Sequence, residues 1–412
     1  MNIPLSDPVP LRETSVWPGY DQIAVIPRVY GRARIAPLRY SEAGTVYVLA
    51  DHPLAGVDAV TLDGSPVSGW RWRNGGDVTG HAVAFLELPE APDTSADLAA
   101  EVRGLDGNPA AIVADLYPRD DLQDFAIYCR NNNLILGGSL AEKTTVRAAI
   151  QFVLDQVGCV WSAGLPGFAL PFPPPAADPT HATFAALDLA DWTAEAELSD
   201  LVTRVTVPFA WDYAAGKATQ SLVLEAKTAS AAYGVRESEL ALPWVTTARQ
   251  ALATATAWLQ WRARPLWRLS ATVGVEWAAL QPGGWIGATH PRLPQSGRYV
   301  LTDVDPGYGR GAVTLAAEAP AGAAPAVTII RQSSAFEPIQ TSYTLSPGGD
   351  SVTVTITDET GQPLPGAKVW IDGQGPQTAD TAARIRFRAT PGDHVLHVEA
   401  DGRTAVDTTL TL

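Results

Sequence analysis

The chain has 412 residues, 46% of them apolar and 18% charged, and it is too long for one ordinary hydrophobic core, so roughly three domains are expected. Its 44 acidic and 29 basic residues leave a formal charge of −15, which disfavours nonspecific binding to a phosphate backbone or an anionic membrane surface. No run of 18 apolar residues and no signal-peptide pattern is present, so we expect a soluble chain made in the cytoplasm, without stable membrane insertion.

The first 118 residues are expected to form an extended arm followed by a β domain. Residues 1–19 make up the arm, since their prolines oppose a helix and such a segment must dock on a neighbour to be ordered. Residues 20–118 contain strand-length runs separated by turn signals, namely VYVLA, AVTLDG, GWRWRNG, HAVAFLELP and AAIVADLYP. Trp70 and Trp72 share one strand face, which favours the cap of a small barrel over the lining of a groove.

Residues 119–197 are expected to form a small helical insert and a proline-rich connector. One helix begins behind Asp120 or Asp121 and places Leu122, Phe125, Ala126 and Cys129 at helical spacing. A second helix is introduced by the capping-box spacing of Ser139 and Glu142, and its apolar stripe consists of Val146, Ile150, Val153 and Val157. The connector GLPGFALPFPPPAADP is expected to lack regular structure, because its proline density is too high.

Residues 198–320 are expected to form a second β domain that contains one helix. The helix runs from about Thr246 to Ala263, before Pro265 stops it. Its apolar face consists of Ala248, Leu252, Ala255 and Leu259, flanked by Trp258 and Trp261 as core anchors or as a subunit contact.

The last part of the chain is expected to be a linker over residues 321–350 and a β-sandwich over residues 351–412. Val352, Val354 and Ile356 alternate with threonine, and Val369 and Ile371 continue the same core. The expected fold is therefore mainly β with an α+β insert: two β-barrel-like domains, a small helical insert and a C-terminal β-sandwich.

The sequence contains no motif that assembles a nucleophile, a base and an orienting group. HExxH, GxSxG, P-loop and CxxC patterns are all missing. The six histidines are His52, His81, His181, His290, His394 and His397. Asp51 beside His52 is interpreted as turn capping, because neighbours in an extended segment point apart. His394 and His397 fall on opposite faces of a strand, which disfavours joint metal ligation.

Two further candidates also favour structural interpretations. Asp303 and Asp305 begin like a calcium loop, but Tyr308 and Thr314 stand where Gly and Glu are required, so a turn is expected. Cys129 and Cys159 are the only cysteines, and two buried thiols are favoured over a bridge or a metal pair. We therefore expect no catalytic residue, no cofactor, no metal and no enzymatic activity.

The sequence contains 13 tryptophans, which suggests carbohydrate binding because exposed rings stack on sugar faces. Apart from the pair Trp70 and Trp72 they are spread along the chain, so cores and interfaces are favoured. The others considered are Trp17, Trp192, Trp211, Trp244, Trp258, Trp261, Trp267, Trp277, Trp285 and Trp370.

Several segments, in their order, resemble the baseplate or tail hub proteins of tailed phages of the Mu-like siphophage kind and of gene transfer agents. They are IPRVYGRARIAPLRY, VLADHPLAGVDAVTLDG, VRAAIQFVLDQVGCVW, TVPFAWDY and LQPGGWIGATHP, between about Val25 and Pro320. The resemblance implies a homotrimer at the virion tail tip, with two β-barrel-like domains per chain that match a six-fold tail tube. It also implies the distal tail protein, the tape-measure protein and tail fibre or tip proteins as partners, and a channel through which DNA passes without specific binding.

The segment DETGQPLPGAKVWIDG resembles the immunoglobulin-like, carboxypeptidase-regulatory type of module. This resemblance implies a domain that projects outward as a fibre anchor or a weak glycan-binding decoration. Three alternatives stay open: a distal tail ring protein, a carbohydrate-binding β protein used for host adhesion, and a tail-associated wall hydrolase.

Overall fold

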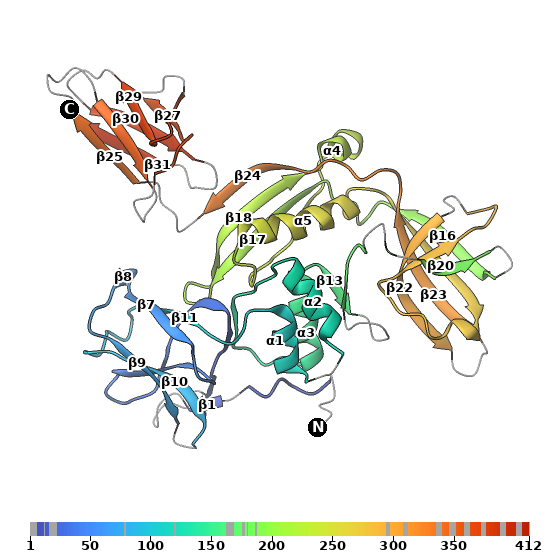
Figure 1. The fold of residues 1–412 in the computed structure, drawn as a ribbon, viewed down its shortest axis with the longest axis horizontal. Coiled ribbons are helices and arrows are strands. Elements are labelled where there is room, and N and C mark those ends of the chain that lie inside the picture. Colours follow the sequence, from blue (N-terminus) through green and yellow to red (C-terminus); the bar gives the residue numbers. More distant parts are fainter. Residues whose placement is uncertain are drawn as a thin grey trace. The chain divides into compact units, whose positions relative to one another are not determined.

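The computed structural model describes residues 6–411 except 12, 16–22, 78–79, 119–120, 162–168, 175–177, 179, 186–187, 294–296, 308–311, 335–339, 346–351, 358–362, 372–375, 388–392 and 401–405. The described residues form a mainly β fold with five α-helices, which confirms the expected class (Figure 1). The chain divides into two compact units, one of residues 1–217 and 224–328 and one of residues 218–223 and 329–412.

The first unit begins with two sheets that enclose one core. The strand order of one is β5 (Leu38–Arg39), β6 (Val46–Ala50), β10 (Ala82–Glu87) and β9 (Arg71–Gly76). The other contains β8 (Ser65–Pro66), β7 (Gly56–Leu62), β11 (Leu98–Arg103), β4 (Arg32–Ile35) and β17 (Arg204–Asp212), in that order. Apolar side chains of β4, β6, β7, β10 and β11 share the core. These sheets are open, so the expected barrel-like domain is a pair of facing sheets.

The turn between β7 and β8 has the geometry that its sequence predicts. Asp63 and Gly64 both have positive φ, at 50° and 77°. Such angles are those of the tight hairpin that an Asp-Gly pair favours.

The helical part differs from the prediction in two places. AAIVADLYP, expected as a strand, lies mostly in helix α1 (Pro109–Leu116), because the side chain of Asn108 accepts from the Ala110 N–H and Pro109 opens the first turn. Ser139, expected to cap a helix, lies instead in β12 (Gly138–Leu140), which pairs with β3 (Arg28–Tyr30).

The other two helices of this region lie close to their expected positions. Helix α2 (Gln123–Asn131) has Leu122 at its N-cap position, so Asp121 lies one residue before the N-cap; Asp120 lies outside the described residues. Helix α3 (Val146–Gln156) is capped by Thr145 and buries the predicted stripe. The arm docks beside this cap, since the Val146 N–H donates to the Asp7 carbonyl at 2.9 Å.

Helix α5 (Ala248–Arg262) confirms the long helix predicted in the second β region, with Thr247 as its N-cap. Its buried face is centred on Ala251, Ala255 and Leu259 and also includes Trp261, and this face packs on β17. Two elements of this region were not predicted: α4 (Lys227–Tyr233), and β19 (Glu237–Glu239), which pairs with β17.

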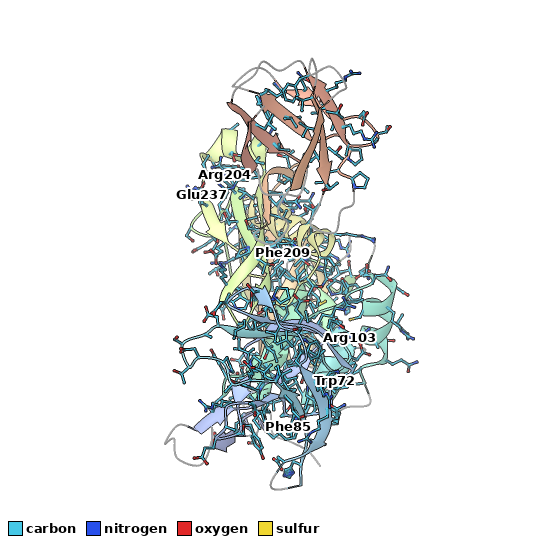
Figure 2. The ribbon with its side chains drawn as sticks, turned by 90° about the vertical axis from the view of Figure 1, so that its left-hand side faces the viewer. Trp72, Phe85, Arg103, Arg204, Phe209 and Glu237 are labelled. Atoms are coloured by element: carbon cyan, nitrogen blue, oxygen red, sulfur yellow. The ribbon has the colours of Figure 1, made fainter. Side chains whose placement is uncertain are left out.

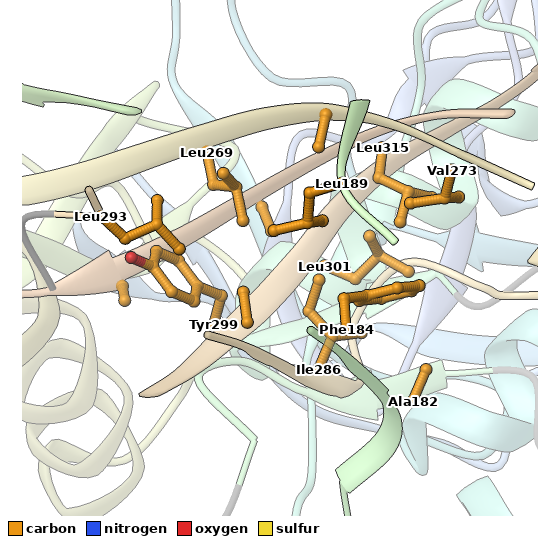
Figure 3. Close-up of a cluster of buried hydrophobic side chains, with 14 of the residues drawn as sticks. Ala182, Phe184, Leu189, Leu269, Val273, Ile286, Leu293, Tyr299, Leu301 and Leu315 are labelled. Atoms are coloured by element: carbon orange, nitrogen blue, oxygen red, sulfur yellow. The ribbon is translucent and has the colours of Figure 1, made fainter. Parts of the chain in front are cut away.

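A six-stranded sheet completes the first unit. Its strand order is β15 (Thr180–Phe184), β21 (Trp285–Ala288), β22 (Gly297–Gly307), β23 (Ala312–Pro320), β20 (Leu266–Gly274) and β16 (Ala190–Glu197). One face carries the cluster of buried side chains drawn in Figure 3, which includes Phe184, Leu301 and Leu315. The predicted second β domain is thus an open sheet with one apolar face.

Shorter elements complete the unit. They are the pair β1 (Glu13–Ser15) and β2 (Ile23–Val25), and the pair β13 (Cys159–Trp161) and β14 (Ala169–Pro171). β14 lies in the proline-rich connector, where no regular structure was expected.

The second unit is a β-sandwich with an additional strand pair. One sheet contains β25 (Gln340–Leu345), β26 (Val352–Thr357) and β29 (Arg384–Phe387). The other contains β28 (Gln377–Thr378), β27 (Lys368–Ile371), β30 (Asp393–Glu399) and β31 (Val406–Thr411). The predicted core residues of both sheets are buried in one cluster. The middle of β18 (Lys217–Glu225) belongs to this unit, where it pairs with β24 (Thr328–Ser334).

Candidate functional site

Asp51 and His52 have structural partners, as the sequence indicates. Asp51 is buried and forms an ion pair with Arg28, whose Nη2 lies 3.2 Å from Oδ2. The Val29 N–H donates to Nε2 of His52 at 3.0 Å. Arg28 also contacts Asp115, which accepts from the Tyr30 hydroxyl at 2.7 Å. These bonds tie β3 to the segment after β6 and to α1.

The electrostatics of this network keep Tyr30 protonated. Burial raises the pKa of the Tyr30 phenol above its ordinary range, and the neighbouring Asp115 carboxylate raises it further. The hydroxyl therefore stays protonated and donates to Asp115 near neutral pH.

The remaining histidines do not gather at one place in the described part of the chain. His81 and His181 are exposed, and His290 lies in a turn, where its ring packs 4.7 Å from that of Trp192. His394 and His397 lie on β30, opposite Leu410 and Asp407, and their side chains are outside the described residues.

The predicted turn at Asp303 and Asp305 is a strand. Both residues lie in β22, opposite Ala316 and Thr314 of β23. Exposed carboxylates on a paired strand do not form a coordination loop. Within the described residues, no group of three or more His, Cys, Asp or Glu side chains is placed to hold a metal ion.

Cys129 and Cys159 are free and buried, which confirms the sequence interpretation. Burial raises the pKa of the Cys129 thiol to about 12 and lifts that of Cys159 above its ordinary range, with a further contribution from Cys129. Both groups therefore remain thiols near neutral pH.

We accordingly expect the native chain to react with Ellman's reagent at pH 8 far more slowly than a free cysteine, because a protonated, buried thiol is a poor nucleophile. In 6 M guanidinium chloride both cysteines should react at the ordinary rate. The measurement is the absorbance of released thionitrobenzoate against time. Rapid reaction of the native chain would contradict the burial of these side chains.

Trp70 and Trp72 pack against the first core, as a cap does. Trp72 lies opposite Leu86, and Figure 2 labels it together with Phe85 of the neighbouring strand. The guanidinium carbon of Arg73 stands 4.6 Å from the centre of the Phe85 ring. Trp70 and Trp72 therefore form an outer layer of the first core, whereas Arg73 and Phe85 lie on the opposite face of the sheet.

The structure brings other aromatic residues together around a cavity of about 360 Å³ that the sequence did not reveal. Trp258, Trp261 and Phe172 line it, and the Phe172 ring meets that of Trp261 edge-on at 5.3 Å. The Trp261 indole N–H donates to Oε1 of Glu318 at 2.8 Å. The spacing of Trp258 and Trp261 on one helix is the part of this site that the sequence indicates. Which strand supplies Glu318 cannot be inferred from that spacing.

Two further cavities lie in the first unit. One, of about 570 Å³, is mainly apolar and includes Phe152, Trp211 and Trp244 in its lining. The other, of about 650 Å³, is polar and shares Trp258 and Arg262 with the aromatic cavity. In the part of the chain that is described, no helix combines the length and the apolar composition needed to span a bilayer.

Comparison with solved structures gives a fold likeness. A chain from the virion of a native gene transfer agent particle aligns with a TM-score of 0.51 and 16% identity, over 77% of this chain and 90% of that chain. A tail protein from Neisseria meningitidis MC58 aligns with a TM-score of 0.36 and 15% identity, over 72% of this chain and 96% of that chain. The 43 kDa tail protein of prophage MuSo2 from Shewanella oneidensis aligns with a TM-score of 0.31 and 11% identity, over 75% of this chain and 97% of that chain. The likeness rests on the first alignment, whose identity indicates a shared fold alone.

No protein-family model matches the sequence, and no curated protein matches it.

Proposed function

We propose that this chain is a structural hub of a phage-type tail tip. In this proposal a homotrimer joins the six-fold tail tube and the distal tail ring to trimeric fibre or tip proteins. The observation that carries it is the fold likeness, over 77% of the chain, to a chain of a gene transfer agent virion. The proposed partners are the distal tail protein, the tape-measure protein and the tail fibre or tip proteins.

Two physical features support this role. Each chain has two β regions, so three chains would supply six β regions, and that number matches a six-fold tube joined to a three-fold tip. The formal charge of −15 suits the wall of a channel, because an anionic surface does not hold the phosphates of passing DNA.

The proposal assigns no catalytic role to the chain. Asp51, His52 and both cysteines have structural environments, and the sequence has none of the hydrolase motifs considered. Loss of turbidity in a suspension of purified cell walls treated with the protein would support the tail-associated wall hydrolase instead.

The C-terminal sandwich is proposed to be an immunoglobulin-like module that anchors a fibre or binds glycans weakly. Binding of the fluorescently labelled full chain to bacterial cells, competed by soluble cell-surface glycan, would support glycan binding. Cells that stay unlabelled at micromolar protein would favour the anchoring role.

The oligomeric state tests the hub directly. We expect multi-angle light scattering to give three times the chain mass of 43.6 kDa, and negative-stain microscopy to show a ring with a central opening. Six copies would favour the distal tail ring protein. A monomer that binds on a glycan array would favour the carbohydrate-binding protein and contradict the hub.

A further inference from the structure

The side chain of Glu318 is a buried carboxylate at the wall of the aromatic cavity. Glu318 lies on β23 and is 8% exposed. Its one side-chain hydrogen bond among the described residues is the bond from Trp261, and no Lys, Arg or His of those residues forms an ion pair with it. Arg262 lines the same cavity, but its guanidinium pairs with Asp200, with Nη1 3.5 Å from Oδ2.

The cavity walls have the composition of a cation site. Trp258, Trp261 and Phe172 supply aromatic rings, whose negative faces attract cations. Val160 and Leu301 supply apolar wall, which keeps water from screening a charge held inside. The exposed Thr302 and the half-buried Trp258 stand at the wall, so a ligand can enter from solvent.

Electrostatics selects the charge of the ligand. A carboxylate that is removed from water without a counter-charge is destabilised, and a cation that enters beside it relieves this cost. An anion is repelled, and a purely apolar group strips the remaining water from the carboxylate without replacing it. Only a cation therefore gains from both the rings and Glu318.

The adjoining cavity indicates how the cation is presented. It shares Trp258 and Arg262 with the aromatic cavity, and Asp200, Arg236 and Glu237 supply hydrogen-bonding groups along its wall. A volume of about 650 Å³ leaves room for the chain that flanks an inserted side chain.

We propose that the cavity between α5, β22 and β23 binds a lysine or arginine side chain of a partner polypeptide, with Glu318 as its counter-ion and the rings of Trp258 and Trp261 around its stem. The backbone beside that residue lies along the polar cavity. This site is independent of the proposed hub function, since the geometry of one chain defines it and any basic partner segment can occupy it.

The test uses the full chain labelled with 5-fluorotryptophan and two capped amino acids as probes. Nα-acetyl-lysine methylamide should shift the fluorine resonances of Trp258 and Trp261, assigned with Trp258→Phe and Trp261→Phe. Nα-acetyl-norleucine methylamide has the same chain without the charge and should bind at least tenfold more weakly. Equal affinities, or no shift with either probe, would overturn the proposal.

The variant Glu318→Gln removes the charge but retains an oxygen that accepts the Trp261 N–H. We expect it to weaken binding of the lysine probe at least tenfold and not to weaken binding of the norleucine probe. Glu239→Gln, at an exposed position on β19, removes the same charge outside the cavity and should change neither affinity.

Stability of the Glu318→Gln variant separates a ligand site from a structural charge. Because Glu318 has no ion-pair partner among the described residues, its neutral replacement should unfold at the same urea concentration as the parent chain or a higher one. If the variant fails to fold, the Glu318 charge has a structural role. The comparison of the lysine and norleucine probes on the parent chain then decides whether the cavity binds a cation.

Discussion

The variant Gly31→Ala is expected to lose about 3 kcal/mol or more of stability, or not to fold. Gly31 joins β3 to β4 with a φ of +57°, in the left-handed region that strains a residue with a Cβ. A Cβ at this position would also overlap the Leu136 carbonyl oxygen and lie 3.1 Å from the Gly137 Cα.

The overlap cannot be relieved by a side-chain rotation, because both obstacles are backbone atoms. The Gly31 N–H donates to the Leu105 carbonyl at 2.8 Å, and the Gly31 carbonyl accepts from the Gly104 N–H at 2.8 Å. The Leu136 N–H in turn donates to the Gly107 carbonyl at 2.8 Å. A shift of any one strand therefore breaks hydrogen bonds of the others.

Gly76→Ala is the matched control, since it adds the same methyl group on β9. The nearest atom to its Cβ would be 3.7 Å away, which is ordinary contact, and its φ is not positive. Urea unfolding followed by tryptophan fluorescence should show a much lower midpoint for Gly31→Ala and a change below about 1 kcal/mol for Gly76→Ala. Equal midpoints would show that the strand junction adapts to a Cβ.

The sequence predicted elements whose signals are local. The strand Val46–Ala50 was recognised from alternation and its turns, and α5 from a 3.6-residue apolar period that ends at Pro265. Helix α1 was missed because its apolar run also suits a strand. Asn108 followed by Pro109 is the cap and first-turn pair that would have identified it.

The candidate cation site could not be predicted in the same way. Trp261 and Glu318 are 57 residues apart, and their hydrogen bond depends on the packing of α5 against a sheet whose strand order the sequence does not specify. The open form of the two β regions is a property of strand pairing as well. Local patterns specify which residues form strands, but hydrogen bonds across the sheet determine whether it closes.

Replacing Phe184 by alanine is expected to cost about 3–5 kcal/mol, which makes it the second large effect. The ring is fully buried in the cluster of the six-stranded sheet, where Figure 3 shows it near Ile286 and Leu301. It meets the Trp277 ring edge-on at 5.1 Å. Its removal leaves a cavity in this cluster, and the lost packing contacts add to the lost transfer free energy of the ring.

The position of Phe184 adds a local consequence. It lies on β15, an edge strand whose one partner in the sheet is β21, in parallel register. An edge strand has hydrogen bonds on one side only, so its stability depends strongly on side-chain packing. We therefore expect the amide protons of 180–184 to exchange with deuterium faster in the variant than in the parent chain, and faster than those of the rest of the sheet.

Val275→Ala provides the control, because Val275 belongs to the same unit and is 59% exposed. Its truncation should change the free energy of unfolding by less than about 0.5 kcal/mol. The measurements are the thermal midpoint by circular dichroism and hydrogen exchange by mass spectrometry. If Phe184→Ala and Val275→Ala unfold at the same temperature, the cluster in Figure 3 is not the core that stabilises this sheet.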